Sequence, residues 1–125
     1  MHLFIVSYLL FCFICDIIHV GVDIMTEKLC PKMETTLELL GKKWIALIVF
    51  ALLSGPKKFS EMEKFIPGLS ARMLTERLKE LELKEIIVKN VYPETPVRIE
   101  YILSQKGVDL TSAFNAIGEW AEKWV

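Results

Sequence analysis

Apolar residues recur at helical spacing along most of the chain after residue 30, and Gly or Pro separates the runs. Residues 31–40 begin with Pro31 and are followed by Gly41, which suits a helix that starts at the proline and ends at the glycine. Residues 44–53 are apolar nearly all round, so we expect a second helix that is buried. The dipeptide Gly55-Pro56 would stop it.

Residues 60–66 carry the pattern of a third, short helix. Ser60 and Glu63 have the S-x-x-E spacing of a capping box, in which each side chain pairs with the other residue's backbone amide. The segment Pro67-Gly68-Leu69 then predicts a turn. These residues therefore predict a helix followed directly by a reversal of the chain.

Beyond the turn, a fourth helix is expected from Ser70, its N-cap, to about residue 84. Leu74, Leu78 and Leu81 lie at i, i+4 and i+7, which gives this helix an apolar face for the core. At about 100° per residue, four polar side chains point the other way: Arg72, Thr75, Glu76 and Lys79.

Two segments rich in β-branched residues, 86–92 and 97–103, flank a stiff tip of residues 93–96 and predict a hairpin. A last helix is expected over residues 108–124, with apolar side chains on one face: Leu110, Phe114, Ile117, Ala121 and Trp124. Helix, turn, helix and hairpin in this order indicate a winged helix-turn-helix, a mainly α (α+β) fold whose second helix fits the DNA major groove. We expect residues 25–125 to form this one domain, with N- and C-terminal helices for dimerisation.

The polar face of the fourth helix has the chemistry to read base edges. Arg72 can pair with guanine, Glu76 can accept from the cytosine amino group, and Thr75 can contact a thymine methyl or a phosphate. The alternative is a solvated face on which Glu76 pairs with Arg72 or Lys79. The flanking turn and hairpin favour DNA binding, and the predicted contacts on this helix are Ser70, Ala71, Arg72, Thr75, Glu76 and Lys79.

Positive side chains elsewhere are candidates for phosphate contacts, which add affinity without reading sequence. They are Lys42, Lys43, Lys57 and Lys58, each of which could instead serve solubility alone. Arg98 follows the hairpin tip, where an arginine can enter the minor groove or contact phosphate. Its alternative is an ion pair with Glu94 or Glu100.

The last helix carries more apolar surface than so small a domain readily covers by itself. Two paired helix-turn-helix units place their reading helices about 34 Å apart on a near-palindromic site. We therefore expect a homodimer on double-stranded DNA, with an interface formed by Phe114, Ile117, Trp120 and Trp124.

Composition changes the picture mainly at the start of the chain. The hydrophobic fraction is 53%, and the excess lies in residues 1–24, where Asp16 and Asp23 are the only charged side chains with histidine neutral. This leader lacks the positive start and the cleavage site of a signal peptide. We interpret it as a misassigned upstream start and expect translation from Met25, which gives a cytoplasmic protein without a membrane segment. A membrane anchor and an extra folded helix are the alternatives.

Charge and cysteine content exclude several classes of protein. Residues 25–125 carry a formal charge of +1, which argues against a non-specific polycation but not against selective DNA binding. Three cysteines in a charged chain do not suggest a disulfide scaffold. Cys12, Cys15 and His19 have a zinc-like spacing but lack a fourth ligand, so we expect no metal.

No catalytic set is visible after the leader. Both histidines precede Met25, which leaves Cys30 without a credible base, and the chain has no Gly-rich phosphate loop. We therefore expect neither an enzyme nor a cofactor. The alternative to a DNA-binding regulator is a winged-helix module that binds protein, because fold does not fix function.

Residues 29–125 resemble the HxlR-type regulators, which are related to the MarR group. The shared motifs are Cys30-Pro31, Gly41-Lys42-Lys43-Trp44, Gly55-Pro56-Lys57-Lys58-Phe59-Ser60-Glu61, Pro67-Gly68-Leu69-Ser70, Leu74-Thr75, Leu78-Lys79-Glu80-Leu81-Glu82, Val91-Tyr92-Pro93-Glu94, Pro96-Val97-Arg98-Ile99-Glu100-Tyr101 and Lys106-Gly107. The resemblance implies a cytoplasmic, dimeric winged-helix transcription regulator that binds DNA through the helix from Ser70 and through the wing.

The resemblance also draws attention to Cys30, because several members of that family sense quinones, aldehydes or oxidants through the matching cysteine. A position at the start of the helix opened by Pro31, with Lys28 and Lys32 nearby, would favour the reactive thiolate. Cys30 is therefore a candidate redox sensor, and an inert packing role is the alternative.

Overall fold

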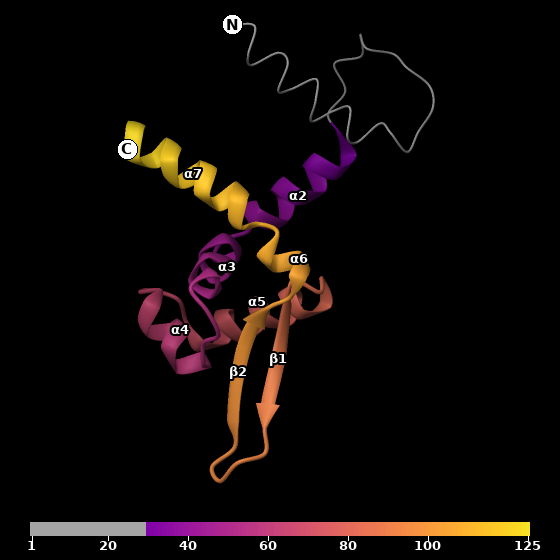
Figure 1. The fold of residues 1–125 in the computed structure, drawn as a ribbon, viewed down its shortest axis with the longest axis vertical. Coiled ribbons are helices and arrows are strands. Elements are labelled where there is room, and N and C mark those ends of the chain that lie inside the picture. The colour runs from indigo at the N-terminus through magenta and orange to yellow at the C-terminus, as the bar shows by residue number, and fades with distance from the viewer. Residues whose placement is uncertain (1–29) are drawn as a thin grey trace, which may run out of the picture. The chain divides into compact units, whose positions relative to one another are not determined.

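The computed structural model describes residues 30–125 and divides the chain into two compact units, residues 1–41 and 42–125. The first unit contributes the described helix α2 (Pro31–Gly41). The second contains α3 (Ile45–Leu53), α4 (Phe59–Phe65), α5 (Ala71–Leu83), β1 (Ile87–Tyr92), β2 (Arg98–Leu103), α6 (Gln105–Val108) and α7 (Thr111–Trp124) (Figure 1). The predictions for residues 1–24, including Cys12, Cys15 and His19, lie outside the described residues.

The helix α2 confirms the boundaries that its proline and glycine predict. Pro31 is its first residue, where a missing amide hydrogen costs nothing, and Gly41 is its last. The carbonyl oxygen of Cys30 accepts the first helical hydrogen bond from the amide of Glu34 at 2.9 Å. Cys30 therefore stands in the N-cap position of α2.

The helix α3 forms the centre of the core, but only one of its faces is covered. Ile45, Ile48 and Val49 are fully buried, whereas Leu47 and Phe50 remain 49% and 51% exposed. The expectation of burial all round is thus wrong for those two residues. The helix also begins one residue later than expected, because Trp44 adopts φ 80° in the left-handed region.

The core of the second unit joins α3 to α4, α5 and the base of the hairpin. Its buried apolar residues are Ile45, Ile48, Val49, Ala51, Leu52, Met62, Ile66, Leu69, Leu74, Leu78, Leu81, Ile86, Ile87, Tyr101 and Leu103. Within the described residues, no polar or charged residue is buried. Packing of apolar side chains is therefore the main stabilising contribution in this unit.

The helix α4 corrects the predicted capping box of Ser60 and Glu63. The helix starts at Phe59, and the carboxylate of Glu61 accepts from the amide of Lys58 at 2.9 Å. The reason lies just before the helix, where Lys57 exchanges backbone hydrogen bonds of 3.0 and 2.8 Å with Tyr101 of β2. This bridge fixes the chain direction and makes Lys58 the N-cap.

The turn before α5 and the cap of α5 follow the prediction. Gly68 has φ 85°, a conformation that glycine adopts at little cost, and Ser70 Oγ accepts from the amide of Met73 at 3.1 Å. At the other end, Glu85 with φ 58° forms a Schellman motif: its amide donates to Glu82 and the amide of Ile86 to Leu81. The helix is thus capped at both ends.

The strands β1 and β2 pair antiparallel, with Ile87 opposite Leu103 and Tyr92 opposite Arg98. The buried pair lies at the base, and the hairpin extends beyond α4 and α5 (Figure 1). Together with α4, the turn and α5, it confirms the predicted winged helix-turn-helix. The fold is mainly helical with one two-stranded sheet in the described residues.

The last helix expected over residues 108–124 is present as α7, but it starts later than expected, at Thr111, and a separate short helix, α6, precedes it. Ser104 caps α6 by accepting from the amide of Gly107 at 3.2 Å. Gly107 is buried, and a Cβ there would lie 2.4 Å from the carbonyl oxygen of Ile86. This close approach holds α6 against the hairpin, and the chain turns at residues 109–110 before α7 begins.

Candidate nucleic-acid interface

The solvent face of α5 presents the residues expected to read DNA. The side chains of Arg72 and Glu76 are 91% and 53% exposed, and Arg72 Nε lies 3.5 Å from Glu76 Oε1. The structure thus shows the pair that the sequence offered as the alternative, formed on a solvated face, and base reading by these residues stays a prediction. An exposed i,i+4 pair of this kind contributes only about 0.3–0.5 kcal/mol, so it can open when a stronger partner approaches.

The other predicted residues of α5 have different positions. Thr75 Oγ1 donates its proton to the carbonyl oxygen of Ala71 at 2.8 Å. The lone pairs of Oγ1 can still accept a hydrogen bond from another group. Ser70 uses its hydroxyl as the N-cap, and Ala71 and Lys79 are exposed. The expected DNA-facing set is therefore exposed and extends from the N-cap of α5 to Lys79.

Two of the four candidate phosphate lysines lie at the start of α4. The Lys57 ammonium donates to Ser54 Oγ at 2.8 Å and lies 5.7 Å from the centroid of the Phe65 ring. Lys58 is exposed at the N-cap. Both cations flank the first helix of the helix-turn-helix, which usually crosses the DNA backbone in such folds.

The hairpin positions Arg98 among opposite charges. Its guanidinium lies 3.4 Å from a carboxylate oxygen of Glu94 and 3.5 Å from one of Glu100. It also stacks over the ring of Tyr92, with Cζ 4.2 Å from the centroid. Both ion pairs that the sequence offered as an alternative are formed, so a phosphate would compete with two carboxylates for this arginine.

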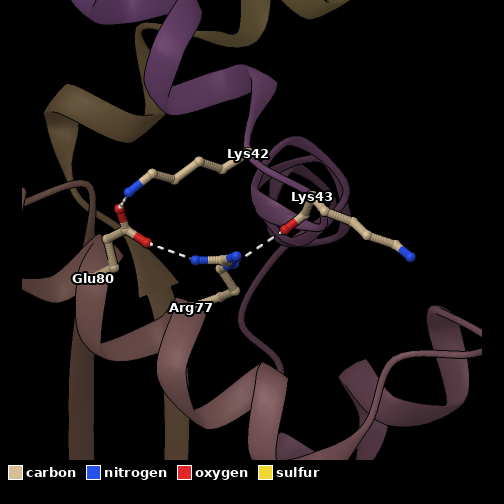
Figure 2. A network of polar contacts seen from close by, with 4 residues as sticks. All are labelled: Lys42, Lys43, Arg77 and Glu80. Atoms are coloured by element: carbon tan, nitrogen blue, oxygen red, sulfur yellow. Dashed lines mark hydrogen bonds and ion pairs between the residues drawn. The ribbon is translucent and has the colours of Figure 1, made fainter.

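The remaining two candidate lysines belong to an arrangement that the sequence did not reveal. Glu80 accepts a hydrogen bond from Lys42 and another, of 3.1 Å, from Arg77 Nη1. Arg77 Nε also donates to the carbonyl oxygen of Lys43 at 3.0 Å, while the Lys43 side chain extends away (Figure 2). We name these three side chains and that carbonyl the Glu80 cluster.

The Glu80 cluster perturbs the acid at its centre. The hydrogen bond from Lys42, with the positive charges of Lys42 and Arg77, holds the pKa of Glu80 below its ordinary value, and partial burial opposes this shift. No sequence spacing predicts the cluster, because Lys42 and Lys43 lie 38 and 34 positions before their partners. Only the tertiary fold, which places residues 42–43 beside α5, brings them together.

The helix α7 leaves its apolar face uncovered. Phe114 contacts Phe50 of α3, with ring centroids 6.1 Å apart. Farther along, Ile117, Trp120 and Trp124 are 59%, 60% and 66% exposed. Large apolar side chains gathered on one exposed helix face are typical of an interaction surface.

Cys30 is half-buried at the start of α2, with Lys32 exposed two residues later. Among residues 30–125, no group of His, Cys, Asp or Glu is arranged to hold a metal ion. In the same range, no helix has the length and apolar character needed to cross a membrane.

Comparison with known proteins gives consistent matches over the same region. The family model described as HxlR-like helix-turn-helix matches residues 39–125. The helix-turn-helix-type transcriptional regulator YvaP of Bacillus subtilis (strain 168) is 50% identical over 99 residues, which span 79% of this chain and 92% of YvaP.

Two solved regulators have the same fold. The reduced form of the transcriptional regulator YodB from B. subtilis matches with a TM-score of 0.70 and 47% identity, covering 78% of this chain and 95% of YodB. YodB is also known in diamide-treated and quinone-bound forms. The oxidized form of the redox regulator HypR matches with a TM-score of 0.69 and 34% identity, covering 74% of this chain and 95% of HypR.

Proposed function

Because the chain belongs to the HxlR-like helix-turn-helix family of transcriptional regulators and is not an enzyme, we propose that it binds a near-palindromic DNA operator as a homodimer. The observation that carries this proposal is the division of α5 into a buried leucine face and an exposed face with Arg72 and Glu76. An α-helix fits the major groove, where these two side chains meet base edges with matching chemistry. Its DNA partner would place the protein in the cytoplasm.

A binding titration on the DNA upstream of the chain's own gene tests this proposal. We expect sequence-selective binding, with Arg72→Ala weakening operator affinity by about 1–3 kcal/mol and relaxing the preference at one base pair. Lys64→Ala, which removes an exposed cation of α4, is the matched control and should leave base preference unchanged. Equal affinity for operator and unrelated duplex would contradict the proposal.

The wing supplies a second contact through Arg98. Bidentate arginine binds phosphate strongly, and a duplex offers many phosphates, so DNA can displace Glu94 and Glu100 from the guanidinium. Arg98→Ala should lower the affinity for operator and for unrelated DNA alike. The slope of log affinity against log salt concentration should decrease by the amount expected for about one phosphate contact. A change in base preference instead would assign Arg98 to base reading.

The homodimer would form through the apolar face of α7. Burial of Ile117, Trp120 and Trp124 against a second copy, together with the part of Phe114 that Phe50 leaves uncovered, removes apolar surface from water. Sedimentation should give twice the mass of the chain. A monomer at micromolar concentration, still selective for a palindrome, would contradict this arrangement.

Regulation would act through Cys30. The N-terminus of α2 favours thiolate, and YodB, a relative, is known in quinone-bound and diamide-treated forms. The thiolate adds to a quinone ring carbon, a C–S bond forms, and the ring takes up a proton to become a hydroquinone. We propose that this modification alters the pairing of the two copies and lowers operator affinity.

Replacement of the thiol tests the regulatory proposal. Cys30→Ser should bind operator normally and retain it when quinone or diamide is added, whereas the unmodified chain releases it. A Cys12→Ser/Cys15→Ser variant, which keeps Cys30, is the matched control and should still respond. Release that persists in Cys30→Ser would rule out this mechanism.

A further inference from the structure

The Glu80 cluster lies directly beside the face of α5 that is proposed to read DNA. Glu80 follows Glu76 by four residues, one helical turn or about 6 Å along the axis. The two carboxylates differ in their surroundings: the Glu76 side chain is 53% exposed with one distant partner, and that of Glu80 is 21% exposed with two close ones. The same residue type therefore has two different roles on successive turns.

The cations that Glu80 holds come from the segment before α3 and from α5 itself. The Lys42 side chain is 50% exposed, and Arg77 is carried by α5 one position after Glu76, with its guanidinium against Glu80 (Figure 2). A positive side chain at the edge of a reading helix normally neutralises a phosphate, and such contacts supply most of the non-specific affinity for DNA. Here one carboxylate pairs with both cations, which leaves the three side chains with a net charge of +1, and Arg77 also donates to the Lys43 carbonyl oxygen.

We propose that Glu80 is a specificity-determining residue, which keeps Lys42 and Arg77 paired beside α5 and withholds them from phosphates. This inference rests on the proposed DNA binding. Selectivity is the ratio of operator affinity to affinity for other DNA, and a backbone contact strengthens the second as readily as the first. Limiting backbone contacts near α5 leaves Arg72, Thr75 and Glu76 to decide which sequence is bound. The tie to the segment before α3 also fixes the orientation in which α5 presents them.

The Glu80→Gln variant of the full chain tests this role, because the amide keeps the shape of the side chain and loses its charge. The probes are a duplex carrying the site that the unmodified chain selects from random DNA, and an unrelated duplex of equal length. We expect the affinity for the unrelated duplex to rise about five- to tenfold per released cation at about 0.1 M salt. The slope of log affinity against log salt concentration should steepen by about one phosphate contact per released cation. The ratio of the two affinities should fall by a similar factor.

The matched control is Glu82→Gln, which makes the same change of formal charge on the same helix. Its carboxylate forms no ion pair with another described residue, so it measures the effect of net charge alone. Equal salt dependence and equal selectivity in the two variants would overturn the inference. So would a parallel loss of affinity for both duplexes, which is the result expected if Glu80 served folding only.

A second variant decides the matter even if Glu80→Gln does not fold. The Lys42→Ala variant should bind DNA with the same salt dependence as the unmodified chain, because Lys42 is already paired with Glu80. A decrease by about one contact would show that Lys42 binds phosphate in the native complex and would overturn the inference. If the unmodified chain selects no DNA sequence, the proposed function fails and the inference fails with it. If the unmodified chain binds selectively and the variants bind DNA as it does, only the inference is rejected.

Discussion

The helices α5 and α7 carry similar amounts of apolar residues but use them differently. In α5, Leu74, Leu78 and Leu81 are at most 1% exposed, and the core of the same chain covers them. In α7 no residue is buried, although the helix contains Phe114, Ile117, Trp120 and Trp124. The core of the same chain covers the apolar face of α5, whereas the apolar face of α7 remains exposed and is the surface proposed to pair with a second copy.

The difference shows how a small regulator divides its surface. A helix that must present a fixed polar face needs its apolar face packed into the core, since any rotation would move Arg72 and Glu76 away from the position in which they are proposed to contact bases. A helix that pairs two copies must instead keep its apolar face available. Four substitutions test this contrast, from the largest expected effect to the smallest.

Leu78→Ala should have the largest effect, because it creates a cavity under the reading face of α5. Leu78 is 1% exposed, and truncation of such a leucine costs about 2–5 kcal/mol in the free energy of unfolding. Urea unfolding measures the loss. Leu83→Ala, at an 85% exposed position of the same helix, should change it by less than about 0.5 kcal/mol. Similar losses in both variants would break the contrast.

Trp120→Ala should act on association rather than on folding. Removing a tryptophan from the centre of an interface typically costs about 2 kcal/mol or more, which corresponds to about a 30-fold weaker dimer. Sedimentation equilibrium measures this change, with the exposed Glu122→Ala on the same helix as control. A stable dimer in Trp120→Ala would place the interface elsewhere.

Gly107→Ala tests the junction that leads from the hairpin into α7. A Cβ at this position would meet the carbonyl oxygen of Ile86 at 2.4 Å, so the backbone must shift, at a cost of about 1–3 kcal/mol. Gly118→Ala in α7 has no described atom within 4 Å of its new Cβ. Made in the Trp120→Ala background to limit partner contacts, it should stabilise the helix by up to about 1 kcal/mol. Thermal unfolding compares the two, and a loss at both positions would show that α7 is packed as tightly as α6.

Glu85→Gly should give the smallest effect, a gain in stability at the end of α5. Glu85 has φ 58°, where a side chain is disfavoured, and glycine relieves this at a net gain of about 0.5–1 kcal/mol. Glu85→Ala removes the charge but keeps the Cβ and should give no gain. Urea unfolding measures the stability of both variants. Equal changes in the free energy of unfolding would show that the charge of residue 85, and not its backbone conformation, matters here.

The helix α5 could be predicted almost completely because its signals are local. Ser70 caps it, three leucines repeat at helical spacing, and Pro67-Gly68-Leu69 precedes it, all within a few residues of one another. The exposed set on its other face follows from the same periodicity. The hairpin and the start and end of α2 were equally accessible, since turn and cap residues determine backbone direction over short distances.

The predictions that failed concern places where distant segments meet. Ser60 and Glu63 have good capping chemistry, but the backbone bridge between Lys57 and Tyr101 moves the start of α4. The break between α6 and α7 follows from the contact of Gly107 with the hairpin. In each case a tertiary hydrogen bond or a close contact outweighed a local preference worth about 1 kcal/mol.

The sequence by itself determined which surfaces exist: a helix with an apolar and a polar face, a wing with an arginine near its tip, and a last helix rich in aromatic residues. The sequence also offered the ion pairs of Arg98 with Glu94 and Glu100. Only the tertiary structure decided the charge that α5 presents beside its exposed face, because Glu80 pairs with Lys42 from 38 positions away. Periodicity and caps act between neighbours in the chain. The strength of an ion pair depends on distance and burial, which packing alone sets.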